Sequence, residues 1–199
     1  MAILESREKK LCAAESSRPR TKFLSSHFYT RLFDCEASYE SVAPSIVRWL
    51  TQPRSRDDSC PDPLDYYSKW IVPVNIGNYH WALMVVRFQE QKIEFYDSIP
   101  NSSVASRRMK NMLRFIGDVA KATRRTDLAD VAQPGRGWVC SLVESPSQNL
   151  DYDDCGIFAI LNALIEMSGQ RITRYSYRHQ DIYDLDIRSR IACEILSSV

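Results

Sequence analysis

Three runs of β-branched and aromatic residues lie close together near the middle of the chain and constrain its fold more than any other feature. They are Trp70–Asn75 (WIVPVN), His80–Phe88 (HWALMVVRF) and Lys92–Tyr96 (KIEFY). Residues of these types favour strands, and runs with so few polar positions indicate a sheet that is largely buried. Residues 89–91 (QEQ) predict a hairpin turn between the last two strands. The centre of the chain therefore predicts a buried sheet that contains at least one hairpin.

Segments with helical patterns flank these strands on both sides. The expected helices cover Ala2–Glu15, Ser25–Phe33, Tyr39–Leu50, Ser103–Thr123, Cys155–Ser168 and Asp184–Leu196. One further strand is expected over Trp138–Glu144 (WVCSLVE), and Pro44 breaks or begins the third helix. Helices, then strands, then more helices predict an α+β layout.

The chain has 199 residues, which is the length of one ordinary domain. Only short stretches have a loop-like composition, and they lie at Ser16–Lys22, Gln52–Asp65, Ile99–Ser103 and Glu144–Asp154. We therefore expect a single domain over residues 1–199. With 44% hydrophobic and 26% charged residues, the composition is that of a globular chain rather than a disordered one.

Net charge and hydropathy argue against several classes of function. A formal net charge of +1 argues against a general nucleic-acid binder and against a polybasic membrane anchor. No apolar run approaches the roughly 18–20 residues that cross a bilayer. The first segment, Met1–Lys22, is charged and carries no signal-peptide core, so we expect an intracellular protein.

The six cysteines include no C-x-x-C pair, which argues against a zinc site and against a thioredoxin-type redox motif. They are Cys12, Cys35, Cys60, Cys140, Cys155 and Cys193. We expect no metal site, and reduced thiols fit an intracellular protein.

Any cysteine–histidine chemistry must draw on the only three histidines, His27, His80 and His179. His80 begins one predicted strand of the hairpin, and Asp97 ends the other. In a hairpin whose turn is centred on residue 90, two residues lie opposite each other when their residue numbers sum to about 180. The numbers of His80 and Asp97 sum to 177. A carboxylate beside the imidazole would fix its tautomer and stabilise its protonated form. The alternative is a surface histidine and a turn-forming Asp-Ser pair.

Cys155 is the most informative cysteine because it opens an apolar helix. Free N–H groups and the positive end of the helix dipole favour a thiolate there, and Gly156 leaves room for a substrate backbone. The two preceding aspartates, Asp153 and Asp154, could oppose the thiolate by charge. One of the three aspartates Asp151, Asp153 and Asp154 is more simply a helix N-cap. The alternative for Cys155 is a small buried hydrophobe, which is the reading we give the other five cysteines, or an inert surface position.

Two further side chains are candidates for the same site. Gln148 lies in a loop seven residues before Cys155, and its amide could donate to the oxyanion of an acyl transfer. Trp81 follows His80, so by strand alternation it points to the opposite face or covers the adjoining cleft. Taken alone, Gln148 would be solvated and Trp81 would be a core residue.

In chain order these residues are His80-Trp81, Asp97-Ser98, Gln148 and Asp154-Cys155-Gly156. Together they resemble the cysteine proteases that process and remove SUMO and related ubiquitin-like modifiers, the sentrin-specific protease type, whose wider clan includes the adenovirus protease. Further segments that resemble this family are Phe28-Tyr29-Thr30-Arg31-Leu32, Arg48-Trp49, Pro73-Val74-Asn75, Tyr96-Asp97-Ser98 and Asp186-Ile187-Arg188-Ser189-Arg190-Ile191. The resemblance extends from about residue 20 to the C-terminus.

The resemblance implies a papain-like α+β fold and a role for each motif residue. Cys155 would be the nucleophile, His80 the general base and then acid, Asp97 the residue that orients His80, and Gln148 a part of the oxyanion hole. Trp81 would cover a narrow tunnel that admits the Gly-Gly tail of the modifier, and any larger side chain would clash there. The implied partners are SUMO or another ubiquitin-like protein and its conjugates. The resemblance implies a monomer that needs no cofactor, in the nucleus or the cytoplasm.

Three departures from the family pattern stand out. The family's usual Trp-Leu-Asn-Asp stretch is missing, and Met1–Glu15 resembles the end of the helix that follows it. His27 stands where relatives often carry an aromatic residue that contacts the modifier, so it is a packing or surface residue or a substrate contact. The spacing from Gln148 to Cys155 is one residue longer than in typical SUMO proteases, as it is in the adenovirus enzyme. His179 lies in a polar stretch, and we expect it to be exposed.

Two rival functions follow from the same residues. In the family, the tryptophan of the missing Trp-Leu-Asn-Asp stretch forms the other wall of the tunnel. Without that wall, the chain could bind a modifier and cleave it slowly or not at all. Some clan members use the same residues as acyltransferases, but these rely on a glutamate in the third position and on an inositol-phosphate site. The chain has Asp97 at that position and no obvious basic pocket.

Overall fold

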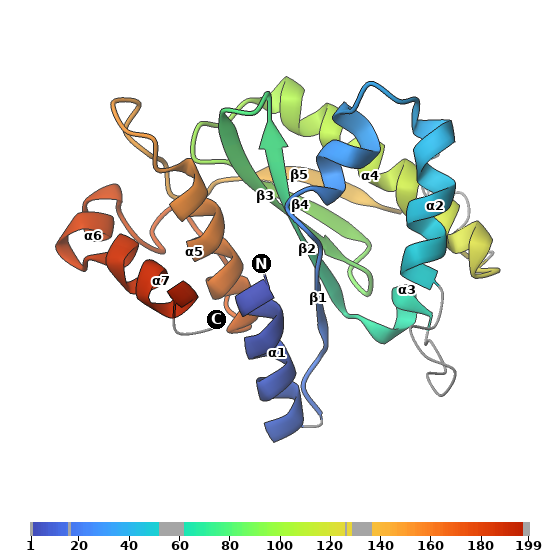
Figure 1. The fold of residues 1–199 in the computed structure, drawn as a ribbon, viewed down its shortest axis with the longest axis horizontal. Helices are drawn as coiled ribbons and strands as arrows, with labels where there is room; N and C mark the ends of the chain where they lie inside the picture. Colours follow the sequence, from blue (N-terminus) through green and yellow to red (C-terminus); the bar gives the residue numbers. More distant parts are fainter. Residues whose placement is uncertain (1, 16, 52–61, 126, 129–136, 197–199) are drawn as a thin grey trace.

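The computed structural model describes residues 2–15, 17–51, 62–125, 127–128 and 137–196, and its centre is a five-stranded sheet (Figure 1). The strands lie in chain order across the sheet, as β1 (Thr21–Phe23), β2 (Lys69–Ile76), β3 (His80–Arg87), β4 (Lys92–Tyr96) and β5 (Val139–Val143). The three central strands are antiparallel, whereas β1 and β5 run parallel to their neighbours. The mixed sheet with helices confirms the predicted α+β class.

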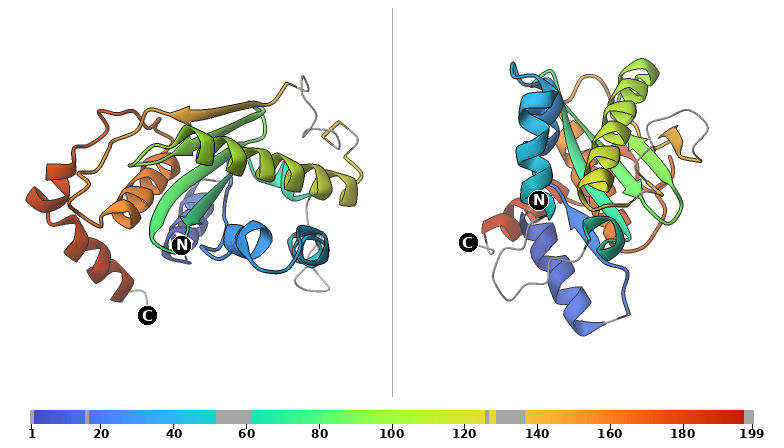
Figure 2. Two further views of the ribbon diagram at one scale, coloured as in Figure 1. Left: turned by 90° about the horizontal axis from the view of Figure 1, so that it is seen from above. Right: turned by 90° about the vertical axis from the view of Figure 1, so that its right-hand side faces the viewer.

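The described helices lie on both faces of this sheet (Figures 1 and 2). They are α1 (Ala2–Ala14), the π-helix η1 (Thr30–Asp34), α2 (Tyr39–Thr51), α3 (Pro63–Tyr66), α4 (Ser102–Ala122), α5 (Cys155–Met167), α6 (His179–Asp184) and α7 (Ile187–Leu196). Helices α2 and α4 cover one face, and α5 and α1 cover the other. The continuous apolar strands are explained by this arrangement, since both faces of the sheet are buried.

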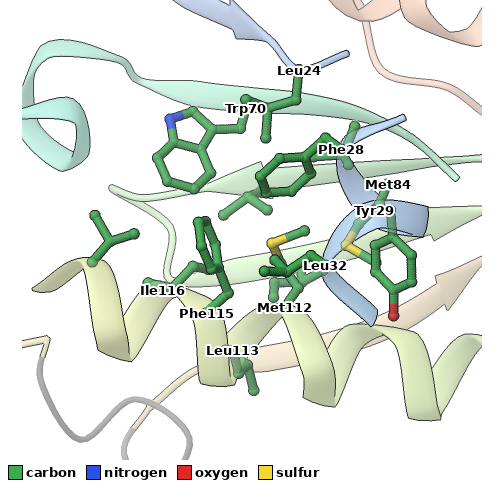
Figure 3. Packing of buried hydrophobic residues seen from close by; sticks show 14 of the residues in the cluster. Leu24, Phe28, Tyr29, Leu32, Trp70, Met84, Met112, Leu113, Phe115 and Ile116 are labelled. Atoms are coloured by element: carbon green, nitrogen blue, oxygen red, sulfur yellow. The ribbon is translucent and has the colours of Figure 1, made fainter. Parts of the chain in front are cut away.

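Alternate residues of the central strands enter two separate cores. On the side of α2 and α4, Trp70 and Met84 are fully buried with Phe115 and Tyr29 (Figure 3). On the side of α5, Leu83 and other strand residues pack against the helix. Because successive strand residues point to opposite faces, one hairpin supplies both cores and fixes its own register.

A buried ion-pair network joins the second half of α5 to the sheet. The Arg87 guanidinium donates to Glu94 Oε2 over 2.7 Å and to Glu166 Oε2 over 2.6 Å. Lys69 also contacts Glu166, which is fully buried. This network holds the second half of α5 against the sheet.

The sequence predicted most elements, but several expectations were wrong. Pro44 neither breaks nor begins α2 but lies inside it, and the helix expected over Ser25–Phe33 is in part the π-helix η1. Strand β1 and helix α3 were both expected to be loop, but β1 is a three-residue edge strand and α3 a single turn that Asp62 caps. Helix α6 was not predicted, and the last helix begins at Ile187 rather than at Asp184, because Asp186 between the two helices has a positive φ of 47°. Cys60 lies outside the described residues.

Candidate active site

His80 is the first residue of β3 and follows a tight turn from β2. Gly77 and Asn78 both have positive φ, 62° and 65°, and the Asn75 side chain accepts the Asn78 N–H over 2.9 Å. This turn pairs Ile76 with His80 at the end of the sheet. The imidazole is therefore held at the rim of the sheet with 11% of its side chain exposed.

Asp97 follows β4, and the structure brings it beside His80. His80 Nε2 lies 2.6 Å from Asp97 Oδ1, which also accepts the Ile99 backbone N–H over 2.9 Å. The observed hairpin register pairs Leu83 with Tyr96. Their residue numbers sum to 179, one unit from the expected sum of 180. Since a carboxylate accepts hydrogen bonds, Nε2 carries the proton and Nδ1 offers a lone pair. No hydrogen-bond partner for Nδ1 is found among the residues that the structure describes.

Cys155 is the first residue of α5 and is buried, with 7% of the residue exposed. The Asp154 carbonyl oxygen accepts the N–H groups of Ile157 and Phe158 over 2.8 and 3.0 Å, which closes the first turn of the helix. The remaining N–H groups of that turn have no partner within the helix. Free N–H groups at the N-terminus of a helix can stabilise negative charge placed beside them.

One cavity of about 310 Å³ brings His80, Asp97, Gln148 and Cys155 together. Half-exposed or exposed apolar side chains, Tyr79, Ile99, Leu150 and Tyr152, also line it. Four candidate residues that are spread over 76 positions of the chain thus share one hollow. The arrangement offers a nucleophile, a base with a free lone pair, and an orienting carboxylate.

Gln148 is held at this cavity by both ends of its amide. Its Oε1 accepts from Ser98 Oγ over 2.8 Å, and its Nε2 donates to the Tyr152 carbonyl over 2.9 Å. An amide nitrogen carries two hydrogens, so one N–H remains for a further acceptor. Because Ser98 follows Asp97, this bond also ties the Gln148 loop to the end of β4.

Trp81 and Gly156 lie beside each other, whereas His27 lies elsewhere. A Cβ built on Gly156 would lie 3.8 Å from Trp81 Cδ1, so the indole edge lies against the start of α5. His27 is exposed and lines a different cavity of about 350 Å³, together with Arg31 and the half-exposed Trp49. The structure therefore separates His27 from the cavity that contains Cys155.

A second histidine–carboxylate pair next to Cys155 was missed by the sequence analysis. The expectation that His179 is exposed was wrong, because only 15% of its side chain is accessible and its Nε2 lies 2.8 Å from Asp154 Oδ2. Tyr183 and Arg188 also bind the Asp154 carboxylate. The only hint in the sequence was the position of an aspartate directly before the cysteine.

Asp154 occupies the N-cap position of α5, but its side chain caps no helix N–H. Burial acts to raise the pKa of Asp154, yet hydrogen bonds from His179, Tyr183 and Arg188 outweigh it and hold this pKa below its ordinary value. The charge that could oppose a thiolate is therefore already neutralised by its own partners.

Comparison with known proteins identifies the family. Residues 1–197 match the model of the Ulp1 protease family, C-terminal catalytic domain. The chain belongs to the Ulp1 protease family. It therefore carries the catalytic domain of a cysteine protease family, as the order of its motifs predicted. No helix in the described part of the chain is long and apolar enough to cross a membrane.

Curated relatives of this family member are similar over most of the chain. Ubiquitin-like-specific protease 1 of Saccharomyces cerevisiae is 26% identical over 152 residues, which cover 75% of this chain and 21% of that protein. A sentrin-specific protease of Caenorhabditis elegans is 28% identical over 128 residues, or 64% of this chain and 16% of that protein. The chain thus matches about a fifth of the length of these relatives.

Solved structures of the family have the same fold. The SUMO protease Ulp1 with its catalytic cysteine oxidised to a sulfonic acid aligns with a TM-score of 0.60 at 22% identity, over 90% of this chain and 69% of that one. The C-terminal Ulp1 protease domain in complex with Smt3, the yeast orthologue of SUMO, gives the same TM-score at 21% identity, over 90% and 68%. The expected protease fold is therefore confirmed.

Proposed function

We propose that this chain is a thiol protease that hydrolyses the bond after the C-terminal Gly-Gly of SUMO or a related ubiquitin-like modifier. It would release the modifier from a lysine side chain or trim a modifier precursor. The observation that carries the proposal is the His80–Asp97 pair at 2.6 Å, which shares a cavity with a cysteine at a helix N-terminus. The names of the relatives, proteases for ubiquitin-like proteins, support the substrate class.

Each candidate residue has a role in the proposed reaction. The Cys155 thiol gives its proton to His80 Nδ1, and the thiolate attacks the carbonyl carbon of the last glycine. The second N–H of Gln148 and the N–H groups at the start of α5 hold the oxyanion. His80, oriented by Asp97, then protonates the leaving amine, which departs and leaves a thioester. Water that loses a proton to His80 hydrolyses this thioester and frees the thiol.

Trp81 and Gly156 would select the tail of the modifier. The indole edge lies against Gly156, so a chain passing between them has little room for side chains, and two glycines fit where larger residues clash. His27, on the separate cavity beside Trp49, would contact the folded body of the modifier. In this proposal residues 1–199 act as one catalytic domain, as an intracellular monomer in the nucleus or the cytoplasm, without metal or cofactor.

The test uses the purified chain with two kinds of probe. A Gly-Gly vinyl-sulfone derivative of each modifier should form a covalent adduct on Cys155, and a fluorogenic SUMO substrate should be turned over. Cys155→Ala should abolish both results and leave the melting temperature unchanged. The matched control is Cys35→Ala, which removes an exposed thiol outside the site and should leave adduct formation and turnover unchanged.

Three outcomes would contradict the proposal. Turnover that persists in Cys155→Ala would remove this residue from the mechanism. Binding of a modifier without adduct or turnover would favour a binding module. Transfer of label from acetyl-CoA, with no reaction of any modifier probe, would favour an acyltransferase.

A further inference from the structure

The second histidine–carboxylate pair uses both nitrogens of its imidazole within the protein. His179 Nε2 lies 2.8 Å from Asp154 Oδ2, and His179 Nδ1 lies 3.0 Å from the backbone N of Asn149. A backbone N–H can only donate, so Nδ1 must accept and carries no proton. Since a carboxylate can only accept, Nε2 must carry the proton. The contacts therefore require a neutral His179 in a single tautomer.

These two contacts connect the C-terminal helices to both sides of the catalytic cysteine. Asp154 is fully buried and directly precedes Cys155, and Asn149 directly follows Gln148. The segment between them crosses from the oxyanion candidate to the nucleophile. His179, on α6, contacts its first and its last part.

The remaining neighbours of the imidazole fix its plane. The ring centroids of Tyr152, Phe158 and Tyr183 lie 5.4, 5.5 and 5.6 Å from that of His179. These rings come from the loop, from α5 and from α6. The Tyr183 hydroxyl donates to Asp154 Oδ2 over 2.7 Å, and Arg188 of α7 binds the other carboxylate oxygen. The titratable or charged groups around His179 are thus Asp154, Tyr152, Tyr183 and Arg188.

We propose that neutral His179 is a positioning residue that holds the Gln148 loop and the start of the Cys155 helix in their reactive arrangement. We call its bonds to Asn149 and Asp154 the His179 latch. The inference rests on the proposed function for its effect on turnover, but the latch itself is a property of the folded chain. Protonation of Nδ1 removes the acceptor of the Asn149 N–H. In an acidic medium the bond to Asn149 is therefore lost, while the bond to Asp154 remains.

The first experiment needs no variant. Two-bond ¹⁵N–¹H correlation spectra of the labelled chain at pH 7.5 should show His179 protonated on Nε2 only. As the pH falls, the Asn149 amide should lose its protection from hydrogen exchange together with the protonation of Nδ1. An Nδ1–H tautomer, or Asn149 exchange that ignores this protonation, would overturn the proposal.

The second experiment separates the two halves of the latch with amide side chains. In His179→Gln the side-chain nitrogen takes the position of Nε2, so the Asp154 contact is kept and the Asn149 contact is lost. In His179→Asn the side-chain oxygen takes the position of Nδ1, so the reverse holds. Gln180→Ala, a neighbouring exposed residue that bonds only Asp184 among the described residues, is the matched control.

We expect His179→Gln to lower kcat for a SUMO–Gly-Gly substrate by roughly 10–100-fold with KM within about 2-fold, because a misplacement of about 1 Å has such a cost. Asn149 exchange should quicken and the alkylation of Cys155 by iodoacetamide should change in the same variant. His179→Asn should restore Asn149 protection and most of the lost kcat, and Gln180→Ala should match the wild type. An unchanged kcat in His179→Gln would overturn the proposal. If the wild type turns over no Gly-Gly substrate, the proposed function fails, while the spectra, exchange and alkylation still decide the latch.

Discussion

Two histidine–aspartate pairs flank Cys155, and they differ in what lies on the far side of the imidazole. The pairs have similar contacts, 2.6 Å between His80 and Asp97 and 2.8 Å between His179 and Asp154. His80 Nδ1 has no hydrogen-bond partner among the described residues, and His80 lines the cavity that contains the cysteine. His179 Nδ1 is occupied by a backbone N–H.

This difference distinguishes a histidine that can transfer a proton from one that only holds its neighbours in place. A histidine that holds a carboxylate with one nitrogen and offers the other to a cavity can accept and return a proton. A histidine whose two nitrogens are both bound within the fold can only hold its neighbours in place. We therefore expect the environment of the second nitrogen, and not the presence of a pair, to decide the role of each histidine.

The largest effect should come from removing the imidazole that faces the cavity. His80→Gln keeps a polar side chain but provides no base, so kcat for a SUMO–Gly-Gly substrate should fall by roughly 10³-fold or more, well beyond the loss in His179→Gln. Thermal unfolding should show an intact fold. A His80→Gln protein that keeps a tenth of the wild-type kcat would erase the distinction between the two pairs.

Asp97→Asn should have the next largest effect, because an amide can present its N–H to His80 and favour the wrong tautomer. A loss of roughly 10²–10⁴-fold in kcat is expected from steady-state turnover. Asp151→Asn, an exposed carboxylate in the nearby loop, is the control and should stay within about 2-fold of the wild type. Equal losses in both variants would mean that kcat responds to the loss of any nearby negative charge rather than to the contact between Asp97 and His80.

Gln148→Ala tests whether the loop that the latch holds contributes to catalysis. Loss of one oxyanion donor should lower kcat by roughly 10²-fold, and KM should change little. Gln170→Ala removes an exposed amide elsewhere and should have no effect. If Gln148→Ala keeps full kcat while His179→Gln loses it, the loop that the latch holds acts through a group other than the Gln148 side chain.

The smallest effect on turnover, and a large one on stability, should come from the Arg87 network, whose residues are not among the described ones that line the cavity of Cys155. Arg87→Met removes the buried guanidinium that the Glu94 and Glu166 carboxylates share, so unfolding in urea should show a loss of about 3–5 kcal/mol. Among molecules that remain folded, kcat should stay close to that of the wild type. A large fall in kcat without loss of stability would contradict a purely structural role.

The lowered pKa of Glu94 predicts in which direction the stability of the fold changes as the pH falls. Burial acts to raise the pKa of Glu94, but bonds from Lys92, Arg87 and Tyr96 outweigh it and lower the pKa from 4.5 to about 2. A lowered folded pKa adds stability that is complete above the unfolded value and is lost as the pH falls toward about 2. The stability difference between the wild type and Glu94→Gln should therefore shrink from pH 6 to pH 3. Glu36→Gln, an exposed control, should show no such trend.

Local patterns predicted the elements that depend on neighbours in the chain. The hairpin of β3 and β4 was predicted with its register to within one unit, because a short turn and two apolar runs leave few other pairings. Strand β1 was missed because three residues carry no periodicity, and its pairing partner, β2, begins 46 positions after its last residue. The break at Asp186 was missed because no glycine or proline marks it.

By itself, the sequence determined strands β2 to β5, the His80–Asp97 hairpin pair and the helix that starts at Cys155, since each depends on short-range periodicity or on a single turn. The tertiary structure alone decided that His80 shares a cavity with Cys155 and that His179 reaches back over Asp154 to Asn149. The physical reason is that these contacts join segments 25 to 75 residues apart, whose relative placement is set by packing on the two faces of the sheet.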